Sequence, residues 1–138
     1  MESGQLTIDS GHFSTADHIC KEFPMNQTVA EKSFAFSVRI VNAYKHLTTE
    51  QKEHVMSKQL LRCGTSIGAN IAEAQQAQSR ADFLSKLSIS LKEASETNYW
   101  LRLLYATGYL SDMEFHSLIA DCHELEKMLT AIIKTTKQ

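Results

Sequence analysis

The stretch that decides the fold runs from residue 60 to residue 74 and reads LLRCGTSIGANIAEA. Its residues sort into three stripes at helical spacing. The apolar stripe is Leu60, Cys63, Ile67, Ile71 and Ala74; the small stripe is Gly64, Gly68 and Ala72; the polar stripe is Arg62, Ser66, Asn70 and Glu73. Because a surface helix needs only one apolar stripe, this pattern indicates a helix with neighbours on several sides.

The small stripe predicts a close helix crossing. Gly64 and Gly68 each cost about 1 kcal/mol relative to alanine inside a helix. Two such penalties four residues apart need a compensating contact, and a missing side chain lets a neighbouring backbone approach. We therefore expect Gly64, Gly68 and Ala72 to pack closely against another helix.

The composition indicates one soluble, helical domain. The chain has 138 residues, of which 43% are hydrophobic and 22% charged, as is ordinary for a globular protein with a core. A single proline and five glycines leave little material for turns, which favours long helices over an all-β fold. The net charge of −2 supplies no global basic field for phosphate backbones.

The three cysteines, Cys20, Cys63 and Cys122, are odd in number and form no CxxC pair. This pattern argues against a disulfide framework and favours a reducing compartment. No apolar run is long enough to cross a bilayer, and the first residues lack the pattern of a signal peptide. We therefore expect a cytoplasmic protein that has no membrane partner.

Residues 1–27 lack sustained periodicity and are expected to form a flexible or loosely docked tail, with one short helix near Thr15–Phe23. The remainder, 28–138, is expected to be a four-helix bundle. In its first segment, Phe34 and Phe36 belong to an alternation typical of a strand, but both also head stripes at helical spacing. Because about twenty residues are too long for a typical strand, we predict a helix buried on more than one side.

Capping residues divide the rest of the chain. Thr48 with Gln51, and Ser79 with Asp82, have the spacing of capping boxes at helix starts. Gly108 is expected to end a helix in the left-handed conformation, and Ser111 to start the next one. The predicted helices are residues 28–47, 49–78, 79–107 and 112–135. Four helices with short connections predict an all-α, antiparallel up-and-down bundle.

The third predicted helix is apolar on two sides. One side carries Phe83, Leu87, Leu91, Ala94, Leu101 and Tyr105, and the other carries Ile89, Glu93, Glu96, Trp100 and Leu104. A helix of this kind is central in its domain or lies in an oligomer interface. Tyr99, Trp100 and Tyr105 also lie near its end; they are either core and interface anchors or a surface for stacking on bases.

The polar stripe has three interpretations. Arg62 can pair bidentately with Glu93 or Glu96 across the bundle, which would fix the register of the helices. The stripe can instead be a binding surface, or the two glutamates can serve as a catalytic acid and base. A catalytic pair would need a pocket and a substrate group, and the sequence indicates neither. Without a Glu-x-x-His motif, zinc spacing or a phosphate-binding loop, we expect no metal or cofactor.

Four stretches carry a family resemblance: QLLRCGTSIGANIAEA at 59–74, SRADFLSKL at 79–87, LKEASETNYWL at 91–101 and TGYL at 107–110. Over residues 29–135 the chain resembles the bacterial four-helix-bundle family first known from proteins encoded within intervening sequences of large-subunit ribosomal RNA genes. In most members a glycine follows the IAE triplet. Here Ala74 stands in its place, which predicts a longer second helix.

The resemblance implies an antiparallel four-helix bundle that assembles as a homopentamer around a central channel, without an established enzymatic activity. The family is also similar to the accessory variability determinant proteins of diversity-generating retroelements, which bind nucleic acid and a reverse transcriptase through basic surfaces.

We therefore expect a non-catalytic, self-assembling interaction or scaffold protein. The polar residues expected to organise its assembly are Arg62, Ser66, Asn70, Glu73, Glu93 and Glu96. The alternative is an RNA- or DNA-binding accessory protein, partnering a reverse transcriptase, with Lys127, Lys134 and Lys137 as its contacts. The same lysines also suit a solvated helix end. A third class is an enzyme that uses Glu93 or Glu96.

Overall fold

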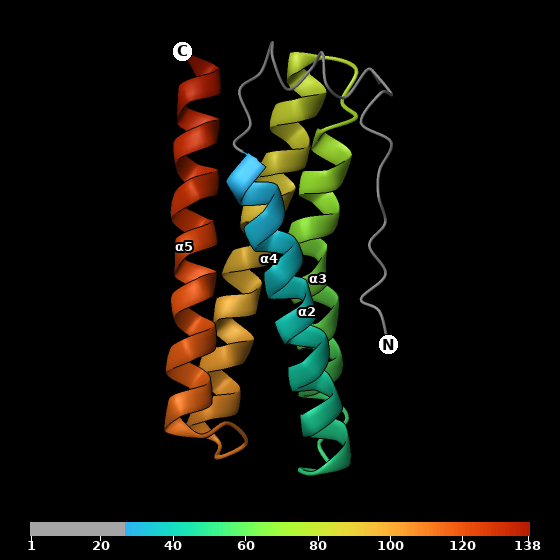
Figure 1. The fold of residues 1–138 in the computed structure, drawn as a ribbon, viewed down its shortest axis with the longest axis vertical. Helices are drawn as coiled ribbons and strands as arrows, with labels where there is room; N and C mark the ends of the chain where they lie inside the picture. The colour runs from blue at the N-terminus through green and yellow to red at the C-terminus, as the bar shows by residue number, and fades with distance from the viewer. Residues whose placement is uncertain (1–26) are drawn as a thin grey trace.

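The computed structural model describes residues 27–138, which form four helices and no strand (Figure 1). The helices are α2 (Gln27–Thr49), α3 (Met56–Ala74), α4 (Arg80–Ala106) and α5 (Asp112–Lys137). The prediction of an all-α bundle is confirmed. The predicted tail, its short helix near Thr15–Phe23 and Cys20 lie outside the described residues.

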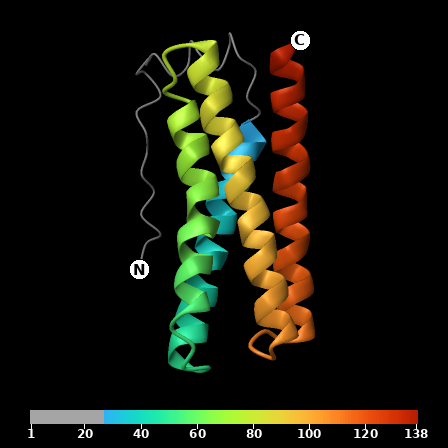
Figure 2. The ribbon, with the colours of Figure 1, turned by 180° about the vertical axis from the view of Figure 1, so that it is seen from behind.

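The helices run alternately up and down and occupy the four corners of the bundle (Figures 1 and 2). Within the described chain, α2 packs on α3, α3 on α4, α4 on α5, and α5 returns to α2, whereas the backbones of the two diagonal pairs do not lie side by side. This order gives the bundle four sides, each formed by two consecutive corners.

The core lies where one stripe of each helix meets the other three. Its largest fully buried side chains are Phe36, Ile40, Leu47, Leu60, Ile67, Ile71, Phe83, Leu87, Leu101, Leu104, Leu125 and Leu129. Burying a large apolar side chain contributes about 1.5–3 kcal/mol. The α2–α5 side is closed differently, by ion pairs: Lys32 Nζ lies 2.7 Å from Glu124 Oε2, and Arg39 Nη1 lies 2.6 Å from Asp121 Oδ2.

Only one stripe of α2 is buried, so the prediction of burial on more than one side is wrong for the single chain. Phe36, Ile40 and Leu47 are fully covered, whereas Phe34 is 71% exposed and Val38 is 46% exposed. Because α2 stands at a corner and lies side by side only with α3 and α5, its second apolar stripe faces outward.

The predicted start of the second helix at Thr48 and Thr49 is also wrong. The Thr48 hydroxyl donates to the Tyr44 carbonyl at 2.9 Å and belongs to the last turn of α2. The cap is supplied by the buried Glu53, whose carboxylate accepts from the backbone N–H groups of Val55, Met56 and Ser57 at 2.7–3.0 Å. A carboxylate that satisfies three orphan N–H groups is a stronger cap than a hydroxyl.

We expect Glu53→Gln to lower the free energy of unfolding by about 1–2 kcal/mol at neutral pH. Burial raises the pKa of Glu53, but its backbone hydrogen bonds outweigh that effect and hold the pKa below its usual range. The stabilisation is therefore present above the unfolded-state pKa and is lost as pH falls through the folded-state value. Urea unfolding of both proteins at pH 7 and below pH 4 measures this; a stability difference that grows on acidification would contradict it.

The second helix ends four residues earlier than predicted, at Ala74. The N–H of Gln76 donates to the Glu73 carbonyl at 2.9 Å, and the N–H of Ala77 donates to the Ala74 carbonyl at 3.1 Å. These tighter bonds turn the chain so that Ala77 is fully buried. The helix thus ends at Ala74, and the prediction that this residue lengthens it is wrong.

The remaining caps agree with prediction, except that the capping box of Ser79 and Asp82 is incomplete. The Ser79 side chain accepts from the Asp82 N–H, and Ser111 forms a complete capping box with Glu114. Asp82 does not complete its box, because its carboxylate accepts from the N–H of Gln78. Gly108 has a φ of 86°, the left-handed conformation expected at the end of α4.

Candidate functional site

The three stripes of α3 face three different surroundings. The apolar stripe is fully buried in the core. The small stripe faces α2 and the polar stripe faces α4, since their nearest neighbours come from those helices. Helix α3 therefore forms the corner between two sides of the bundle.

The glycines bring α3 against α2. A Cβ at position 64 would lie 2.8 Å from both γ-carbons of Ile40, and a Cβ at position 68 would lie 3.2 Å from the carbonyl oxygen of Ser33. A side chain at position 64 would collide with α2 as it now lies, whereas one at position 68 would require α2 to give by a few tenths of an ångström. Ala72, the third member of the stripe, is exposed, so the prediction that it packs closely against another helix is wrong.

Arg62 joins α3 to α4, but not through the bidentate pair with a single carboxylate that the sequence suggested. One guanidinium nitrogen lies 3.4 Å from Glu93 Oε1, and the other hydrogen-bonds Glu96 Oε2. The indole N–H of Trp100 donates to the same Glu96 oxygen at 3.0 Å. Hydrogen bonds from Arg62 and Trp100 hold the pKa of Glu96 below its usual range.

The other members of the polar stripe do not extend this network. Ser66 and Asn70 donate to backbone carbonyls one turn earlier in α3, at 2.6 and 2.8 Å. Glu73 forms a separate ion pair with Lys86 of α4, at 3.1 Å. The stripe thus makes two independent links between α3 and α4. Because the charged groups of both links remain partly exposed to solvent, each stabilises the single chain by no more than about 1 kcal/mol.

A groove lies on the bundle's α2–α3 side and has a volume of about 450 Å³. Phe34 lines one side of the groove, and the small residues Gly68, Ala69 and Ala72 line its base and make it deeper. The other lining residues are Ala30, Ser33, Ser37, Thr65, Ile71 and Gln75. The groove was not foreseen from sequence. The sequence feature that could have indicated the groove is the second apolar stripe of α2, headed by Phe34. From sequence alone, this stripe cannot be distinguished from the stripe that enters the core.

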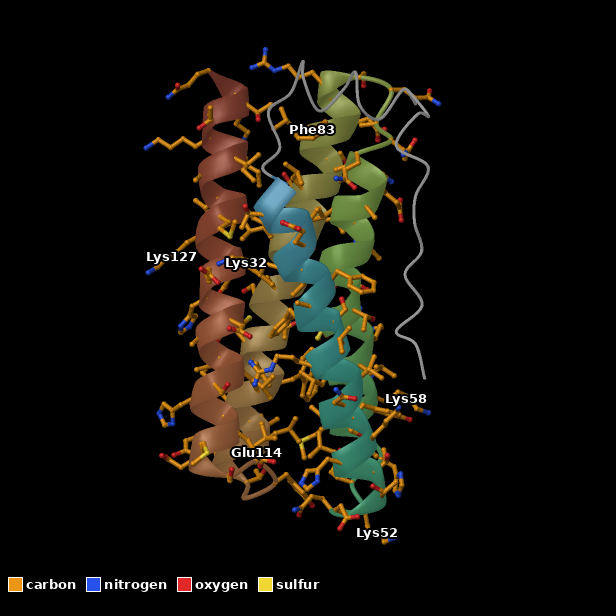
Figure 3. All side chains as sticks on the ribbon, viewed as in Figure 1. Lys32, Lys52, Lys58, Phe83, Glu114 and Lys127 are labelled. Carbon is orange, nitrogen blue, oxygen red and sulfur yellow. The ribbon has the colours of Figure 1, made fainter. Side chains whose placement is uncertain are left out.

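The three candidate lysines are exposed on α5. Lys127 and Lys134 border a shallow depression of about 500 Å³ that also contains Glu126, and Lys127 projects away from the bundle (Figure 3). None of the three lysines forms an ion pair with another residue in the described part of the chain.

The aromatic residues near the end of α4 divide into two groups. Tyr99 meets Trp100 edge-on, with ring centroids 5.1 Å apart. Tyr105 instead stacks on Phe115 of α5 at 4.2 Å, and its hydroxyl hydrogen-bonds Asp112. Tyr105 thus ties α4 to α5, while Tyr99 remains exposed.

Burial raises the pKa of the Cys63 thiol to about 11 and that of Cys122 to about 12. Both cysteines are free. The residues of 27–138 include no group of three or more His, Cys, Asp or Glu placed to hold a metal ion. None of the helices in that range is long and apolar enough to cross a membrane.

We expect Cys63 and Cys122 to react on the order of a hundredfold more slowly with a thiol reagent in the folded protein than in denaturant, because burial blocks access and suppresses the thiolate. The measurement is a thiol titration of Cys20→Ser at pH 8, with and without guanidinium chloride. Fast reaction of either thiol without denaturant would contradict the burial.

The comparisons with known proteins place this four-helix architecture in a family. The model of the 23S rRNA-intervening sequence protein family matches residues 25–131. The chain belongs to this family. A crystal structure of an S23 ribosomal protein family member from Bacteroides thetaiotaomicron, described as a protein with unknown function, is 61% identical, with a TM-score of 0.77. The match covers 78% of this chain and 96% of that one. No curated protein matches.

Proposed function

We propose that this intervening sequence protein is a non-catalytic, self-assembling interaction protein whose copies form a ring. The observation that carries the proposal is the groove on the α2–α3 side, with Phe34 71% exposed beside it. Soluble monomers rarely expose contiguous apolar patches of this kind, and such patches mark sites of association. The family resemblance supports a homopentamer.

The state of the two glutamates supports a non-catalytic role. Glu93 and Glu96 are engaged by Arg62, and neither lines the groove. Because the pKa of Glu96 is lowered, this carboxyl is a poor proton donor near neutral pH. The arginine and its two partners instead suit the rim of an interface, where polar groups surround apolar contacts.

Light scattering coupled to size-exclusion chromatography tests the assembly. We expect a mass near five times the 15.5 kDa of one chain at micromolar concentration. A second run at high salt should leave the mass unchanged, because apolar burial does not weaken with ionic strength. A monomer across the micromolar range would overturn the proposal.

Binding of RNA or DNA is the second candidate, favoured by the exposed lysines of α5 that have no described acidic partner. If this candidate is correct, a gel shift at low salt should weaken steeply as salt is added, and Lys127→Glu with Lys134→Glu should remove it. Lys52→Glu, at an exposed lysine in the α2–α3 connection, is the matched control. No shift at low salt would exclude the candidate.

A further inference from the structure

We infer that neighbouring copies meet through two different sides of the bundle, so that the α2–α3 face of one copy receives the α3–α4 face of the next. The α2–α3 face comprises Phe34, Val38 and the groove beside them. The α3–α4 face comprises Ile89 and Trp100 on either side of the Arg62 ion pairs. This inference rests on the proposed self-assembly and assigns its contact surfaces.

Each face presents apolar surface that the single chain leaves uncovered. Phe34 and Val38 are 71% and 46% exposed on the first face, and Ile89 is 39% exposed on the second. Small residues lower the floor of the groove beside Phe34, which gives the first face a hollow. A branched side chain such as Ile89 fills a hollow of this kind in knobs-into-holes packing.

The two faces lie at the same level along the bundle. Position 68 of α3 lies against Ser33 and Ser37 of α2, the residues on either side of Phe34 along that helix. One residue earlier, the Ile67 carbonyl accepts from the Ser90 hydroxyl of α4, next to Ile89. A rotation about an axis parallel to the bundle therefore brings Ile89 of one copy to the height of Phe34 in the next. Closed rings need this match, because an offset would instead produce a helical filament.

The two faces also lie on neighbouring sides that share α3 as their corner. Neighbouring sides of a four-cornered bundle face about a right angle apart. An interface repeated between them closes after about four copies, or about five when the sides splay slightly wider. In such a ring α3 points toward the axis, so the exposed Lys58 and Arg62 would line its opening.

A second copy is a better occupant of the groove than the chain's own N-terminal segment. The family model begins at residue 25, so residues 1–24 lie outside the part that the family shares. The structural match likewise takes up 96% of the related chain but only 78% of this one. The matched range of the family model includes Phe34, Val38, Ile89 and Trp100, so both faces lie within the shared part.

Complementation between two variants tests the assignment. Phe34→Asp disrupts only the first face and Ile89→Asp disrupts only the second. Since every interface needs one face of each kind, each variant alone should be a monomer. Mixed in equal amounts, they retain one intact interface and should form a heterodimer of twice the 15.5 kDa chain mass. Met113→Asp is the matched control, because Met113 is 82% exposed on α5, away from both faces. Its mass should equal that of the wild type.

Circular dichroism establishes that each variant remains helical. If Phe34→Asp does not, Val38→Asp on the same face replaces it; if Ile89→Asp does not, Ser85→Arg, at an exposed position one turn before Ile89 on α4, replaces it. If Ile89→Asp keeps the wild-type mass, or if the mixture stays monomeric, the assignment of the two faces is wrong although the protein assembles. Two other arrangements would give that result: an interface between two α2–α3 faces, or a groove occupied by the N-terminal segment. A monomeric wild type would instead overturn the proposed assembly itself.

Discussion

Replacing Gly64 with leucine is expected to lower the free energy of unfolding by at least about 3 kcal/mol. The first carbon of any side chain at this position would lie 2.8 Å from two carbons of Ile40, which is itself fully buried. Ile40 cannot turn away without displacing other core residues, so α2 and α3 must separate. Urea unfolding followed by circular dichroism measures the loss.

Lys58→Leu is the matched control, since Lys58 is exposed on the same helix and points away from the bundle (Figure 3). It introduces the same leucine without a collision and should change the stability by no more than about 0.5 kcal/mol. A Gly64→Leu protein as stable as this control would show that the two helices do not cross as closely as described.

Truncation of Phe36 to alanine is expected to cost about 3–5 kcal/mol of folding stability, because the ring is 1% exposed and its removal leaves a cavity. Phe34→Ala removes the same ring two residues earlier in α2, from a position that is 71% exposed. It should change the folding stability of the isolated chain by less than about 0.5 kcal/mol. The two variants thus separate burial in the core from exposure on the α2–α3 face.

Both variants should be unfolded in urea at several protein concentrations, because assembly that is coupled to folding makes the midpoint depend on concentration. The Phe36→Ala deficit should persist at the lowest concentration, whereas any Phe34→Ala deficit should disappear there. Equal deficits at the lowest concentration would mean that the burial of α2 has been assigned to the wrong stripe.

Much of the fold follows from local sequence. The stripes of residues 60–74, the serine caps and Gly108 predicted four helices and their antiparallel order, because each signal acts through backbone geometry within one or two turns. The start and end of α3 were predicted wrongly. Glu53 supplies the cap from the connection before the helix, and burial of Ala77 sets the end. Neither the cap from Glu53 nor the burial of Ala77 corresponds to a short sequence motif, so neither helix boundary was predicted.

The candidate site was only partly predictable. Residue spacing placed Arg62 opposite Glu93 and Glu96, and that contact is present, although the fork divides between two carboxylates. The glycine stripe did not identify Ile40 and Ser33 as the neighbours it accommodates. Such pairings depend on how the helices are rotated about their own axes, and the spacing within one helix does not determine that rotation.

The sequence by itself determined the elements: four long helices, three chemically distinct stripes on α3, and two apolar stripes on α2 headed by Phe34 and Phe36. Only the tertiary structure decided between those two stripes. The two stripes have similar apolar content, so helical periodicity predicts burial for both of them equally. Because α2 occupies a corner and lies side by side only with α3 and α5, the core accepts the stripe of Phe36 and leaves Phe34 beside an open groove.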